Sequence, residues 1–128
     1  MTLYTMGYSG RTAPELEAEV KKLDATVYDV RLKPFARVPA FRGGALRALL
    51  GNSYIHARGL GNINYKNGGK IELADPDMWI AQIEARLQAG ENIILLCGCK
   101  YWEECHRTVV AELIEKNIGV EAHHYECK

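Results

Sequence analysis

The chain has 128 residues, of which 48% are hydrophobic and 25% charged, and its formal net charge is zero. This length suits a single folded domain, residues 1–128. No apolar run approaches the roughly 20 residues that cross a bilayer, and "MTLYTMGYSG" lacks the features of a signal peptide. We therefore expect no membrane partner and a cytoplasmic protein, in which the four cysteines are thiols or ligands rather than disulfides.

The first half of the chain alternates strand and helix signals. Residues 3–9 and the β-branched run 26–32 are predicted strands. Between them, Thr12 and Glu15 have the spacing of a capping box and predict a helix start, with Leu16 and Val20 on its buried stripe. A weaker helix over 41–51 ends at a glycine. Residues 53–61 are predicted to form a short third strand that runs into a loop.

The second half continues the alternation. Asp75 and Pro76 predict the start of a helix that Gly90 ends. "NIILLC" (92–97) is wholly apolar, as expected for a central parallel strand covered on both faces. A helix over 101–117 and an edge strand over 120–126 complete the series. The pattern predicts an α/β fold, a three-layer, Rossmann-like sandwich with a mostly parallel sheet of about five strands.

Positive charge is concentrated in one segment. From Arg31 to Lys70 the chain has eight cations and no Asp or Glu. Such a segregated surface favours an anionic partner, either a small phosphorylated molecule such as a nucleotide or a nucleic acid. In the alternative interpretation, these cations pair with acids of the flanking helices. The cations are Arg31, Lys33, Arg37, Arg42, Arg47, Arg58, Lys66 and Lys70.

Candidate functional residues gather where the predicted strands end, which in parallel sheets is where ligands bind. The catalytic candidates are Asp29, His56 and Cys97. The ligand-binding candidates are Tyr8, Ser9, Arg31, Arg37, His106 and Arg107, the last two near a helix N-terminus that favours anions. The alternatives are structural: Asp29 and Arg31 as an ion pair, His56 bonded to the backbone, and Ser9 capping a turn.

The segment "LLCGCKYWEECHR" also raises the possibility of a zinc site. It has no C-x-x-C spacing, and as neighbours on a helix Cys105 and His106 would point about 100° apart. We therefore predict no metal and no cofactor. Cys105 is instead expected on a core-facing stripe with Val109 and Leu113. Cys97 could be a strand-to-helix nucleophile, although no arginine stands six residues after it or after Cys99.

Four stretches, "TMGYSGRT", "YDVRLKPFAR", "YIHARGLG" and "LLCGCKYWEECHRTVVAELI", occur in the order found in a bacterial and phage family, which the chain resembles. This is the domain-of-unknown-function family numbered 488. The resemblance implies a small α/β sandwich and supports the site location, but it implies no reaction. Cys99 and Asn62 depart from the family pattern, which often has an acid and a glycine at these positions. The family-like positions are Gly7, Tyr8, Ser9, Asp29, Arg31, Pro34, Phe35, His56, Leu60, Gly61, Cys97, Cys105, His106 and Arg107.

Two classes of function fit these observations. The first is an enzyme that hydrolyses an N-glycosidic or phosphoester bond of a nucleotide or nucleic-acid component. In it, Asp29 and His56 would serve as acid or base, and aromatic residues would stack on a base. The second is a non-enzymatic binding module for the same ligands, and a thiol or zinc protein is a weaker third alternative. The aromatic residues interleaved with the cations are Phe35, Phe41, Tyr54 and Tyr65.

Overall fold

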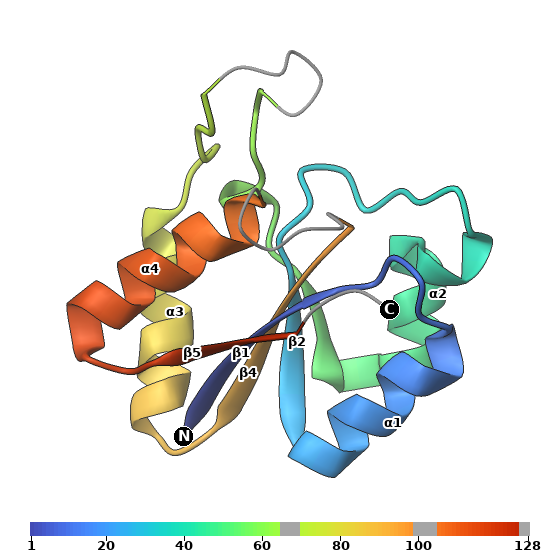
Figure 1. Ribbon diagram of the computed structural model, residues 1–128, viewed down its shortest axis with the longest axis horizontal. Coiled ribbons are helices and arrows are strands. Elements are labelled where there is room, and N and C mark those ends of the chain that lie inside the picture. Colours follow the sequence, from blue (N-terminus) through green and yellow to red (C-terminus); the bar gives the residue numbers. More distant parts are fainter. Residues whose placement is uncertain (65–69, 99–104, 126–128) are drawn as a thin grey trace.

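The computed structural model describes residues 1–64, 70–98 and 105–125 (Figure 1). These residues form a five-stranded sheet in the order β3-β2-β4-β1-β5, with every pair of neighbouring strands parallel. The predicted α/β fold is therefore confirmed. The strands are β1 (Thr2–Gly7), β2 (Ala25–Asp29), β3 (Tyr54–His56), β4 (Asn92–Cys97) and β5 (Ala122–Tyr125). The helices are α1 (Ala13–Leu23), α2 (Gly43–Leu50), α3 (Asp77–Gln88) and α4 (His106–Ile118).

Helices cover both faces of this sheet, so the architecture has three layers (Figure 1). Strand β4 lies at the centre, between β2 and β1, and five of its six residues are buried, as its apolar sequence predicts. Alternate β4 residues enter two separate cores. Ile94 and Leu96 pack with residues of α1 and α2, whereas Ile93, Leu95 and Cys97 pack with residues of α3 and α4.

The helix boundaries follow the capping signals in part. Thr12 and Glu15 form the predicted capping box of α1. Helix α3 begins at Asp77 with Pro76 as its N-cap, so Asp75 is not the cap that we expected. Helix α4 begins at His106, later than predicted, because Cys105 has the extended backbone of an N-cap residue. The start predicted at Tyr101 lies outside the described residues.

The segments after β2 and β3 lie close together at the carboxyl edge of the sheet. A Cβ atom on Gly61 would lie 2.5 Å from the Leu32 Cα atom, so only glycine allows the two backbones to approach this closely. The amide of Ala57 donates a hydrogen bond of 2.9 Å to the Asp29 carbonyl. These contacts hold the cation-rich segment after β2 against the end of β3.

Candidate functional site

Asp29, the last residue of β2, lies at the centre of a buried polar cluster. Its side chain is fully buried and accepts two hydrogen bonds from the Arg31 guanidinium, of 2.8 Å from Nε and 2.6 Å from Nη2. The Arg31 amide also donates to Oδ1 (3.1 Å), and the Tyr54 hydroxyl donates to Oδ2 (2.6 Å). Both carboxylate oxygens are thus occupied, which favours a positioning role for Asp29.

Arg31 continues the cluster toward β1. It is 5% exposed, and its Nη1 donates to the Tyr8 hydroxyl and to the Phe35 carbonyl, both at 3.3 Å. The guanidinium also lies over the Tyr8 ring, 5.1 Å from its centroid. Burial alone lowers the pKa of Arg31, but hydrogen bonding to Asp29 and its negative charge outweigh burial and raise this pKa above its usual value. Arg31 is therefore a permanent cation in a fixed orientation.

Tyr54 is a member of this cluster that the sequence did not reveal as such. It is buried in β3, and burial, followed by the charge of Asp29 and its hydrogen bond, raises the pKa of the Tyr54 hydroxyl. We had expected Tyr54 to stack on a ligand. The register of β2 and β3 explains why Tyr54 instead bonds to Asp29. Tyr54 lies opposite Val27, two residues before Asp29 on β2, and its long side chain extends along the strands so that its hydroxyl reaches the Asp29 carboxylate.

His56 and Ser9 both bond to backbone carbonyls at this edge. The half-buried His56 donates from Nε2 to the Arg31 carbonyl (2.8 Å), so in the neutral ring Nδ1 keeps its lone pair. Ser9 Oγ donates to the Gly98 carbonyl (2.9 Å) and so links the segments after β1 and β4. Tyr8 stacks on Phe41 with the ring centroids 4.7 Å apart, which places its hydroxyl beside Arg31.

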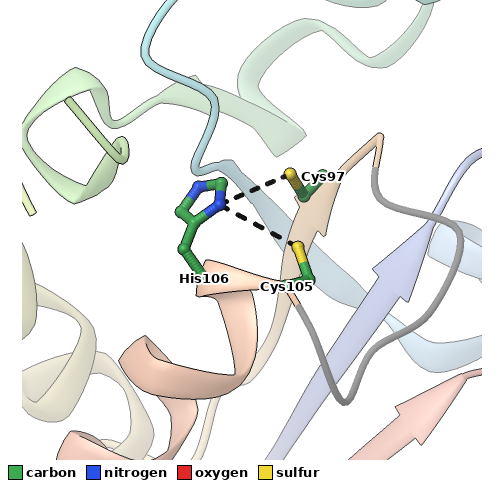
Figure 2. A group of neighbouring side chains, drawn as sticks. All are labelled: Cys97, Cys105 and His106. Atoms are coloured by element: carbon green, nitrogen blue, oxygen red, sulfur yellow. Dashed lines mark hydrogen bonds between the residues drawn. The ribbon is translucent and has the colours of Figure 1, made fainter. Parts of the chain in front are cut away.

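A second cluster occupies the other face of the sheet. Cys97 ends β4, Cys105 precedes α4, and His106 is the first residue of α4; all three are buried (Figure 2). His106 Nδ1 lies 3.8 Å from the Cys97 sulfur and 3.9 Å from the Cys105 sulfur. The divergence expected of two helical neighbours does not occur, because Cys105 is an extended N-cap residue. The predicted stripe is also wrong, since Val109 is half-buried and Leu113 is 37% exposed.

Arg107 lies on the buried side of α4. It is fully buried and shares a helical stripe with Val110, Ala111 and Ile114, which pack in the core on this face of the sheet. Tyr8, Asp29, Arg31 and His56 are joined by the contacts described above. Of the ligand-binding candidates named from the sequence, Arg107 instead belongs to α4, whose buried residues pack on the other face of the sheet.

Most cations of the segment 31–70 face solvent. Six of them are exposed, and none of these six forms an ion pair with a described residue. They are Lys33, Arg37, Arg42, Arg47, Arg58 and Lys70. Pairing with acids of the flanking helices is therefore not seen in the described part of the chain. Lys66 and Tyr65 lie outside it.

Among the aromatic residues proposed to stack on a base, Phe35 has the exposure for this role. Its side chain is 65% exposed, and the Arg42 guanidinium lies 4.7 Å from its ring centroid. Phe41 and Tyr54 are buried in the core, each 2% exposed, so they cannot present a face to a ligand. Phe35 thus joins the exposed cations at the segment that follows β2.

The family model DUF488, a domain of unknown function, matches residues 16–114, which is most of the chain. The chain belongs to the DUF488 family. The resemblance seen in the sequence is thereby confirmed, and the matched part of this DUF488 chain contains Asp29, Arg31 and His56 as well as the Cys97 cluster. No curated protein and no solved structure matches it. In the described part of the chain, no helix has the length and apolar character needed to cross a membrane.

Proposed function

We propose that this DUF488 protein binds a nucleotide, or a nucleotide unit of a nucleic acid, at the carboxyl edge of its sheet and hydrolyses it. The observation that carries this proposal is the set of exposed cations that have no carboxylate partner among the described residues. Lys33, Arg37 and Arg42 belong to the segment that leaves β2 directly after the rigid Asp29–Arg31 pair. Phosphate is the natural partner of such a surface.

Binding is assigned to groups that solvent reaches. Arg37 and Arg42 would contact phosphate, and the exposed Phe35 ring would stack on the base. The half-buried Tyr8 hydroxyl would donate to the ligand. Arg31 would act mainly through the position it gives Tyr8, since Asp29 neutralises its charge and Asp29, Tyr8 and the Phe35 carbonyl already occupy its guanidinium.

His56 is the residue best suited to assist hydrolysis. Its Nε2 donates to the Arg31 carbonyl, which orients the ring and leaves Nδ1 as the base. In the proposed step a water oxygen attacks phosphorus or the sugar C1′ carbon, and Nδ1 accepts the water proton. The phosphoester or N-glycosidic bond breaks, and the proton passes to the leaving oxygen or base nitrogen. Asp29 holds Arg31 and takes no proton.

One observation favours a binding module without catalysis. Both carboxylate oxygens of Asp29 already accept hydrogen bonds. The described cluster therefore offers His56 for acid–base chemistry, but no carboxylate as a second acid or base. Glycoside and phosphoester hydrolysis commonly use two such groups or a metal. Under this alternative the same surface binds the ligand, and no product forms.

Binding is tested by calorimetric titration of the protein with 5′-nucleoside monophosphates, a short single-stranded oligonucleotide and inorganic phosphate. Arg37→Ala should weaken binding of the nucleotide probes and lower the salt dependence of oligonucleotide binding by about one unit of log–log slope. Arg86→Ala, on α3, should leave both unchanged. Absence of binding by every probe, or equal loss in both variants, would refute the proposed ligand site.

Turnover is tested on the probes that bind, by chromatography of the reaction mixture. We expect products from the wild type, none from His56→Gln, and unchanged rates from His123→Gln, which alters an exposed histidine of β5. Binding without product would support the binding module instead. Turnover that persists in His56→Gln would remove His56 from the mechanism.

A further inference from the structure

We infer that Cys97, Cys105 and His106 form a binding site for a thiophilic divalent cation, of which Zn²⁺ is the best match. One ligand atom from each of these residues lies within 4.8 Å of the others (Figure 2). Two cysteine sulfurs and one imidazole nitrogen are a ligand set that holds zinc in proteins. This inference concerns the face of the sheet opposite the proposed nucleotide site and does not depend on that proposal.

The distances agree with tetrahedral coordination. Zinc bonds of about 2.3 Å to sulfur and about 2.0 Å to nitrogen, at tetrahedral angles, place a sulfur and a nitrogen about 3.5 Å apart. The two sulfurs lie 3.8 and 3.9 Å from His106 Nδ1. A contraction of a few tenths of an ångström would bring each sulfur and Nδ1 to the separation of two ligands of one ion. The two sulfurs, which lie within 4.8 Å of each other, would need to approach by at most about 1 Å to reach the spacing of about 3.8 Å that zinc requires.

The His106 ring is already oriented as a metal ligand. Its Nε2 donates a hydrogen bond of 2.6 Å to the Val30 carbonyl, which fixes the tautomer and turns the Nδ1 lone pair toward both sulfurs (Figure 2). A ligating histidine commonly donates its other ring N–H to a carbonyl or carboxylate in this manner. Val30 directly precedes Arg31, so the ion would also tie α4 to the backbone that carries the other cluster.

Charge and burial agree with an ion at this position. The cluster is buried, with Cys97 4% and Cys105 1% exposed. Two thiolates neutralise a divalent cation, so the complex has no net charge to penalise its burial. Cys105 is the N-cap of α4, so its sulfur lies at the positive end of the helix dipole. The ion would join the end of β4 to the start of α4.

The test uses the full-length chain, stripped with a chelator and titrated with Co²⁺ and then Zn²⁺. We expect one Co²⁺ per chain, with thiolate-to-cobalt absorption and the intense visible bands of tetrahedral cobalt, and displacement by Zn²⁺. Zn²⁺ should also raise the melting temperature, because the folded chain binds the ion more tightly than the unfolded chain does.

Variants locate the site. Cys105→Ala and His106→Gln should weaken Co²⁺ binding by more than about tenfold and change the spectrum, whereas His123→Gln should behave as the wild type. Circular dichroism shows which variants fold. If Cys105→Ala or His106→Gln does not fold, the cobalt spectrum of the wild type decides the question. Failure of the wild type to take up Co²⁺ and Zn²⁺ would overturn the inference. So would an unaltered cobalt spectrum in both folded variants.

Discussion

Replacing Asp29 by asparagine separates a positioning role from a catalytic one. The substitution keeps the shape of the side chain but removes the charge that faces Arg31 in a pair buried to 0% and 5% exposure. The new amide group would also direct N–H donors at the Arg31 guanidinium or at the Tyr54 hydroxyl, both of which are donors to Asp29. The variant therefore leaves a buried cation without compensation.

The expected cost is large. Removing one partner of a buried ion pair costs about 3–5 kcal/mol in the free energy of unfolding. For a chain of this size, this corresponds to a fall of about 10–20 °C in melting temperature. Tyr54→Phe removes one hydrogen bond to the same carboxylate and should cost less, about 1.5–3 kcal/mol. Since domains are stable by about 5–15 kcal/mol, both variants should still fold.

Urea unfolding followed by circular dichroism measures these losses. The matched control is Asp24→Asn, which makes the same chemical change at an exposed C-cap with φ of 48°, a conformation that asparagine adopts readily. Its unfolding free energy should change by less than about 0.5 kcal/mol. If Asp29→Asn is as stable as Asp24→Asn and yet abolishes turnover, Asp29 is a catalytic residue and our reasoning about this cluster is wrong.

Three further predictions concern packing, pH and ligand contact. Gly61→Ala should lower the unfolding free energy by about 1–3 kcal/mol through overpacking, whereas Gly44→Ala, in open space on α2, should raise it slightly; chemical denaturation compares them. Burial lowers the pKa of His124 below its ordinary value of 6.5, so at acidic pH the unfolded chain binds a proton at His124 more readily than the folded chain does. The free energy of unfolding should therefore fall as the pH drops below 6.5. Melting temperatures measured across this pH range should fall less in His124→Gln than in the control His123→Gln. Phe35→Ala should keep the melting temperature but weaken nucleotide binding by about 5- to 150-fold in calorimetry, and equal affinity would exclude stacking on this ring.

The sheet was predictable because its strands have simple sequence signals. The apolar run 92–97 is a central strand, since both of its faces are covered, and the capping box at Thr12 marks the start of α1. The contacts of Asp29 were less accessible. The sequence places Asp29 at a strand end, but its bond to Tyr54 requires that β3 lie beside β2 in one particular register, which no local pattern specifies.

A zinc site at the cysteines was considered from the sequence but not predicted, for a different reason. The helix predicted over 101–117 contains Cys105 as a helical residue. On such a helix its side chain would diverge from that of His106 and lie on one stripe with Leu113. In the structure the buried stripe of α4 runs through Arg107, Val110, Ala111 and Ile114. One residue of extended backbone at Cys105 is enough to turn its sulfur toward Cys97 and His106. Helix boundaries are among the features that sequence patterns fix least well.

The most direct test of the proposed function is a map of the ligand site by nuclear magnetic resonance. A ¹⁵N-labelled sample is titrated with a 5′-nucleoside monophosphate, and amide shifts are followed along the chain. We predict that the largest changes occur at the carboxyl edge, at Tyr8, residues 31–42 and His56. Saturable changes confined to the opposite edge, at the hollow lined by Asp24–Thr26 and Gly90–Asn92, would contradict the proposal, as would no changes at all.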